Sequence, residues 1–234
     1  MGEEKLPSVT AIMAISVDGK ISEGAYTPAR FSSEADLRHL ERQIALCDAV
    51  MFGANTLRAY ETSIVIREPK LLKEREERQQ SPQPLHVVCS ISGELQPHWR
   101  FFSQPLPRGL ITTPQGLQNW QRRETGDRGG FFQEFFVVEY PFDWVELMAR
   151  FYSLGYKKIG VLGGANLFSS LLKLGLIEDL WLTICPLLIG KTSALSIVSA
   201  SQLTDFPLPI SLKLVEVEVV GEELFVHYKL KRRR

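Results

Sequence analysis

The chain has 234 residues, and its 27 basic and 27 acidic side chains give a formal charge of zero at pH 7. A balanced charge argues against nucleic acid or an acidic membrane as the main partner. The longest mainly apolar run, residues 180–189, is too short to span a bilayer. The first residues lack the basic start and apolar core of a signal peptide, which predicts a cytoplasmic protein.

Apolar runs alternate with helical patterns along the chain, which predicts an α/β protein with a mostly parallel sheet and helices on its faces. The predicted strands are residues 9–16, 49–53, 85–91, 109–113, 135–138, 158–162 and 179–185. A terminal hairpin of strands 210–220 and 224–230, both alternating in polarity, would make one edge of the sheet antiparallel.

Two helices have clear start and stop signals. The first, at 34–46, follows Ser33, whose hydroxyl suits an N-cap. The second, at 144–154, follows Asp143 and stops at Gly155. The cysteines and histidines are scattered without metal-ligand spacing, so no metal site is expected.

Two charged stretches stand apart from this pattern. Residues 67–83 are predicted to be a solvated helix or loop, and residues 116–130 a mobile excursion. Neither is long enough to divide the chain, so we expect a single domain over residues 1–234, with its core at about 8–230.

The most informative pattern lies in residues 161–190. A short apolar run ends at Gly163-Gly164, a helical apolar face follows, and Gly175 stands where a C-terminal cap is expected. Two glycines between a strand and a helix let the backbone approach a ligand, and the helix N-terminus offers N–H groups to an anion. These residues alone support a phosphate-bearing ligand and a tight turn without ligand equally. The dinucleotide pattern G-x-G-x-x-G is absent.

Taken in order, ISVDGKIS, FSSEADL, DAVMFGANT, PLHVVCS and GVLGGANLFSSLL resemble the reductase half of the riboflavin-biosynthesis deaminase/reductase enzymes. The resemblance covers about residues 9–230 and is most specific around Gly163 and Gly164. It implies a dihydrofolate-reductase-like fold, a homodimer, and transfer of hydride from NADPH to a ribosylaminopyrimidine 5′-phosphate. The zinc signature that the deaminase half would need is absent from this sequence.

The resemblance also implies which residues bind the cofactor. Ala14 and Ser16 match the edge of the nicotinamide site, while the Asp18-Gly19 turn that follows is open to a plain structural reading. The other implied cofactor-binding residues are Thr56, Gly163, Gly164, Ala165 and Asn166. For Thr56, helix capping is the alternative. The cation that would select NADPH is left open among Lys20, Arg58 and Lys191.

Four residues match positions beside the substrate. Ser32 and Ser33 lie in a segment that follows the cofactor or substrate, with simple helix capping as the alternative. Ile64 and Arg67 match positions that touch the substrate, where the arginine would meet its phosphate or remain a solvated charge.

The sequence departs from the family pattern at the reacting centre. The family has Asp-Asp-Pro where this chain has Tyr60, Glu61 and Thr62, so Glu61 and Tyr60 become the candidate catalytic residues. A family glutamate is replaced by Leu162 and a lysine by Ile12. The sequence therefore predicts an NADPH-dependent reductase of the same or a related heterocycle or imine. The alternative is a non-catalytic nucleotide-binding paralogue on the same fold.

Overall fold

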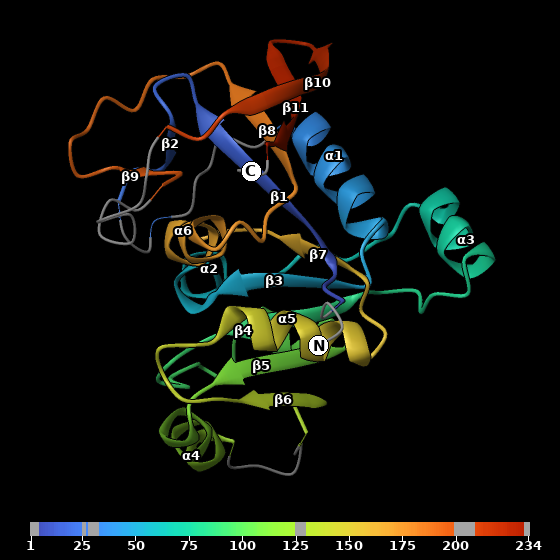
Figure 1. Ribbon diagram of the computed structural model, residues 1–234, viewed down its shortest axis with the longest axis vertical. Coiled ribbons are helices and arrows are strands. Elements are labelled where there is room, and N and C mark those ends of the chain that lie inside the picture. The colour runs from blue at the N-terminus through green and yellow to red at the C-terminus, as the bar shows by residue number, and fades with distance from the viewer. Residues whose placement is uncertain (1–4, 25–26, 28–32, 125–129, 199–208, 232–234) are drawn as a thin grey trace.

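The computed structural model describes residues 5–24, 27, 33–124, 130–198 and 209–231 (Figure 1). Within these residues, nine strands form one sheet in the order β10-β11-β8-β1-β7-β3-β4-β5-β6. Their bounds are β1 Ser8–Ser16, β3 Ala49–Gly53, β4 Leu85–Cys89, β5 Arg108–Thr112, β6 Glu134–Val137, β7 Lys158–Val161, β8 Asp179–Cys185, β10 Leu212–Val220 and β11 Glu223–Leu230. No helix in this part of the chain is long and apolar enough to cross a membrane.

The sheet is mixed, as predicted. The strands from β8 through β1 to β6 all pair in parallel. β11 pairs antiparallel with β8 and with β10, so the terminal hairpin forms the antiparallel edge. This edge and β6 lie at opposite ends of the molecule (Figure 1).

Helices cover both faces of the sheet: α1 Glu34–Ala45, α2 Ala54–Tyr60, α3 Pro69–Glu77, α4 Pro114–Arg123, α5 Trp144–Ser153 and α6 Ala165–Lys173. Neighbouring residues of a strand point to opposite faces, so one strand contacts helices on both. Met51 of β3 packs in the core cluster that contains side chains of α5 and α6, whereas Phe52 packs with α2 and α4. A third cluster joins the end of α1 to α3. A short 3₁₀ helix spans Arg100–Ser103.

The predicted caps are confirmed. The Ser33 hydroxyl accepts a hydrogen bond from the amide of Asp36 at the start of α1, and the Asp143 carboxylate caps α5. Gly175, with φ of 67°, adopts the left-handed conformation just after α6. Each cap satisfies backbone groups that a helix end leaves unpaired.

The prediction of a mobile excursion at 116–130 was wrong for its first half, and residues 125–129 lie outside the described residues. Helix α4 begins after Thr113, whose hydroxyl accepts from the amide of Gly116. The ring of Trp120 is fully buried and stacks on Phe102, with 5.1 Å between centroids. One buried aromatic side chain therefore anchors a helix whose other side chains are mostly polar.

The prediction of a solvated stretch at 67–83 was wrong at its centre. Arg75 of α3 is 1% exposed. Its guanidinium donates to the carbonyls of Ala45, Cys47 and Ser81 at 2.9, 2.8 and 2.8 Å. Two of these acceptors lie where α1 ends, so the buried arginine satisfies carbonyls that have no partner within the helix.

Candidate functional site

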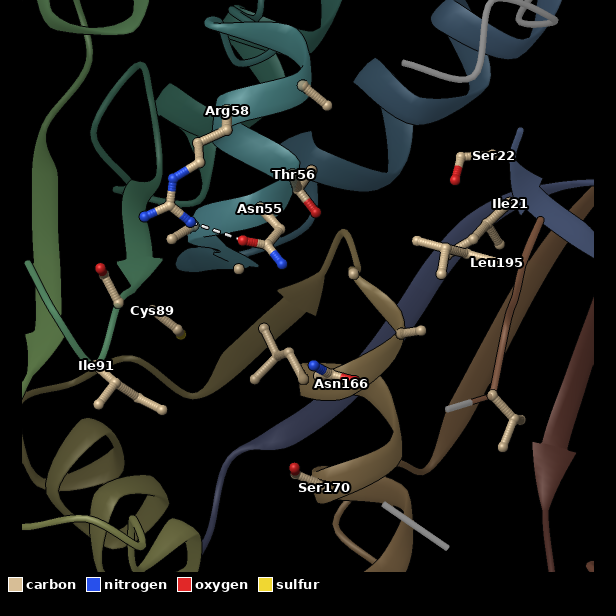
Figure 2. Close-up of a pocket in the computed structure, with 18 of the residues that line it drawn as sticks. Ile21, Ser22, Asn55, Thr56, Arg58, Cys89, Ile91, Asn166, Ser170 and Leu195 are labelled. Carbon is tan, nitrogen blue, oxygen red and sulfur yellow. Dashed lines mark hydrogen bonds between the residues drawn. The ribbon is translucent and has the colours of Figure 1, made fainter. Parts of the chain in front are cut away.

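A cavity of about 950 Å³ opens at the carboxyl ends of strands β3, β4 and β7 (Figure 2). Open α/β sheets bind ligands at this edge, where strand ends and helix starts meet. The cavity is lined by the β3–α2 junction, the end of β4, the segment before α5, the start of α6 and the strands β2 (Lys20–Ser22) and β9 (Leu195–Ser196).

The Gly163-Gly164 turn brings the two sides of this cavity into contact. The Gly53 amide donates to the Gly163 carbonyl at 3.0 Å, and the Gly163–Gly164 peptide bond is cis. A Cβ added to Gly164 would lie 3.3 Å from Oγ1 of Thr56, so a side chain here would press against α2. The glycines therefore permit a close approach of two helix starts.

The start of α6 forms the floor of the cavity. Gly164 is its N-cap and no side chain caps the helix, while Gly164, Ala165 and Asn166 line the cavity. An uncapped helix N-terminus presents backbone N–H groups and the positive end of the helix dipole. This arrangement suits an anionic group such as a diphosphate.

A cation lies at one side of the cavity. Nη1 of Arg58 donates to Oδ1 of Asn55 at 2.7 Å, and Nη2 donates to the carbonyl of Glu94 at 3.1 Å (Figure 2). Among the described residues, Arg58 forms no ion pair with a carboxylate. The guanidinium is therefore oriented by neutral acceptors, and its charge is available to an anionic group such as a phosphate.

The cavity also has an apolar wall, to which Ile91 after β4 and the aromatic residues Tyr140, Phe142 and Trp144 contribute. The three aromatic rings contact edge to face, with centroids 5.8 and 5.6 Å apart. Such a wall suits a flat heterocycle. Cys89 also lines the cavity, but burial raises the pKa of its thiol, so it is not an activated nucleophile.

Five of the predicted site residues come together in the cavity lining: Thr56, Tyr60, Gly164, Ala165 and Asn166. Gly163 lies directly behind them in the turn. Ala14 and Ser16 lie in β1 and do not belong to this lining. The Ser16 hydroxyl, which is fully buried, donates to Asp18 at 2.6 Å and accepts from the amide of Lys20 at 2.9 Å.

The remaining predicted residues lie elsewhere. Glu61 is exposed and ends α2 with φ of 56°. Ser33 caps α1 and donates to the Glu223 carboxylate. Ile64 packs against the third core cluster, and Arg67 is exposed. Ser32 lies outside the described residues. The binding and catalytic roles of all these residues stay predictions.

Sequence reasoning did not single out the aromatic wall or the wall formed by β2 and β9. Strands of three and two residues that pair across the chain leave no periodic signal. Of the three cations left open, Arg58 lines the cavity, while Lys20 bonds to Ser196 and Lys191 pairs with Glu23. No group of three potential metal ligands occurs among the described residues.

Residues 7–226 match the sequence model of the family described as the RibD C-terminal domain. The chain belongs to this family. The resemblance inferred from the sequence is thereby confirmed, and its relatives identify the chain as an oxidoreductase.

One relative is the 2,5-diamino-6-ribosylamino-4(3H)-pyrimidinone 5′-phosphate reductase of Methanothermobacter thermautotrophicus, 26% identical over 229 residues that cover 96% of this chain and 99% of the relative. Among solved structures, a pyrimidine reductase-like protein from Corynebacterium diphtheriae has a TM-score of 0.82 at 22% identity, with 97% of this chain and 93% of the other covered. Dihydrofolate reductase from Enterococcus faecalis, solved with NADP(H), has a TM-score of 0.52 at 13% identity over 96% and 97%. The predicted dihydrofolate-reductase-like fold is therefore confirmed.

Proposed function

We propose that the chain is an NADPH-dependent reductase that transfers hydride to a ribosylaminopyrimidine 5′-phosphate or a related heterocycle or imine. One observation carries this proposal. The uncapped start of α6 and the guanidinium of Arg58 face the same cavity in a member of this family.

The cavity residues fit NADPH in size and chemistry. A volume of about 950 Å³ suits a cofactor of this size. The start of α6 would bind the diphosphate, Arg58 the additional phosphate on the adenosine ribose, and the aromatic wall the adenine. When bound, the nicotinamide supplies the hydride.

The chain's own residues would orient the reactants and provide a proton. Thr56 lies beside Gly164 and can donate its hydroxyl to the cofactor. Of the two candidate catalytic residues, Tyr60 belongs to the cavity lining and Glu61 does not. The phenol of Tyr60 can donate a proton to the nitrogen or ring oxygen of the substrate.

The alternative, a non-catalytic nucleotide-binding protein, is favoured by one observation. None of the described residues in the cavity lining is aspartate, glutamate or histidine. Leu162 also stands before Gly163 where the family resemblance implies a glutamate. A cofactor could bind to such a site without a strong general acid beside it.

Two measurements separate these proposals. Calorimetric titration of the protein with NADPH and with NADH tests the cofactor site, and micromolar NADPH affinity with much weaker NADH affinity is expected. Turnover of the pyrimidinone phosphate named for the archaeal relative, followed by loss of NADPH absorbance, then tests the reaction. Binding without turnover of this substrate or related imines supports the non-catalytic alternative. Binding of neither cofactor refutes the reductase and also favours the non-catalytic alternative.

We also propose that the chain forms a homodimer through β10. The apolar strand β8 lies between β11 and β1, so it has no free edge through which a second copy could pair. Strand β10 is the edge, and its exposed apolar side chains are Leu212, Leu214, Val215, Val217 and Val219. A single reductase domain is supported by one sheet that includes both β1 and β11, and a cytoplasmic location stays a prediction.

A further inference from the structure

One wall of the cavity belongs to a small sheet that is separate from the large one. In the described part of the chain, β9 pairs with β2 and with no strand of the nine-stranded sheet. Figure 2 shows this wall, with Ile21, Ser22 and Leu195, across the cavity from Cys89 and Ile91. Thr56 and Asn166 lie between the two sides. The position of β9 therefore depends on contacts with the residues that follow β1.

Asp18 makes the central contact of this kind. Its Oδ1 accepts from the hydroxyl of Ser16 at 2.6 Å and from the amide of Ile189 at 3.1 Å. Its Oδ2 accepts from the amide of Gly190 at 2.9 Å. The bond from Ser16, followed by those from the two amides, lowers the pKa of Asp18 to about 2. The carboxylate is therefore ionised at neutral pH and joins the turn after β1 to the segment at Ile189 and Gly190.

Other contacts extend this connection toward β9. The Val17 amide donates to the carbonyl of Leu187 at 2.9 Å, and Nζ of Lys20 donates to Oγ of Ser196 at 3.1 Å. Lys191 pairs with Glu23, but both side chains are more than half exposed, so this ion pair contributes little. The buried Ser16 and the carboxylate that it orients form the better ordered connection.

We propose that Asp18 is a positioning residue, which clamps residues 187–196 onto the turn after β1 and so holds Leu195 and Ser196 in the cavity wall. Asp18 is not part of the lining and acts on a ligand through this wall. That this ligand is NADPH rests on the proposed function. With the additional phosphate of NADPH at Arg58 and the diphosphate at α6, the end formed by β2 and β9 receives the nicotinamide riboside half.

The variant Asp18→Asn tests this clamp in the full chain, because an NH2 group, which donates, replaces one of the two accepting oxygens. The probes are NADPH and adenosine 2′,5′-bisphosphate, which lacks the nicotinamide half. We expect NADPH affinity to fall about tenfold, as is typical of coupling between a site and a neighbouring element, with the bisphosphate unchanged. Loss of a negative charge alone would strengthen binding of either anion, so the expected direction opposes simple electrostatics.

Glu23→Gln is the matched control, since it removes the same charge just beyond β2 and breaks an exposed ion pair with the same segment, at Lys191. Its NADPH affinity should stay within about twofold of the wild type. Equal weakening of both nucleotides by Asp18→Asn, or no weakening of NADPH, would overturn the proposal.

Amide hydrogen exchange tests the clamp without any nucleotide. In Asp18→Asn, the amides of Ile189 and Gly190 should exchange faster than in the wild type, because both donate to the Asp18 carboxylate. If the wild type binds neither nucleotide, the proposed function fails and exchange alone decides. Faster exchange at these amides then supports the clamp, and unchanged exchange overturns it.

Discussion

Replacement of Arg58 by alanine should remove the preference for NADPH over NADH. Two of its guanidinium nitrogens are engaged by Asn55 and the Glu94 carbonyl, which fix its position at the cavity rim. A hydrogen bond between charged groups contributes about 1.5–3 kcal/mol. Because about 1.4 kcal/mol corresponds to a factor of ten, NADPH affinity should fall roughly 10- to 150-fold. NADH lacks the additional phosphate, so its affinity should change little.

Calorimetric titration of both cofactors at one ionic strength measures this change. Arg58→Lys should give an intermediate loss, since it keeps the charge but not the planar group with two parallel donors. Arg123→Ala is the matched control, because Arg123 pairs with the carboxylate of Glu94 but does not line the cavity. A parallel loss for both cofactors in Arg58→Ala, or no loss for NADPH, would refute the assignment of the phosphate to Arg58.

Three further predictions concern stability and assembly. Gly163→Ala should destabilise the fold by about 1–2 kcal/mol, seen as a lower Tm, because Gly163 has φ of 91°; an unchanged Tm would contradict this. Burial lowers the pKa of His86 from 6.5 to about 3, so the native state binds fewer protons than the unfolded state and stability falls as pH falls through this range. Urea unfolding should show this loss, up to about 1.4 kcal/mol per pH unit, and His86→Gln should remove it; an equal pH dependence in the variant would count against it. Val217→Lys on β10 should convert the dimer into a monomer in sedimentation experiments, whereas a wild-type monomer would reject the β10 interface.

The sheet could be predicted because its strands are short apolar runs bounded by turn residues. The prediction for β4 ran to residue 91, but the strand ends at Cys89 because the following residues turn into the cavity. Helix α4 could not be predicted in the same way. Its burial depends on Trp120 meeting phenylalanines from distant parts of the chain, which a local pattern does not contain.

The sequence could predict only the part of the candidate site that is formed by consecutive residues. Gly163-Gly164 and the start of α6 follow each other in sequence, so the anion site could be placed from the pattern. Arg58 could not be ranked, because its direction depends on how α2 packs beside β4. Composition likewise could not distinguish the buried Arg75 from its exposed neighbours. Only the fold brings the carbonyls of Ala45 and Cys47, at the end of α1 and just after it, to the guanidinium of Arg75.

The place of β1 in the sheet has a consequence for synthesis on the ribosome. β1 lies inside the sheet, between β8 and β7, and these parallel neighbours begin only at Asp179 and Lys158. β1 must therefore wait, unpaired and apolar, until the segments that form β7 and β8 have been translated. Chaperones that bind nascent apolar segments would encounter β1 during this interval. The cavity can form only later, after the start of α6 and the lining residues of β9 have been synthesised.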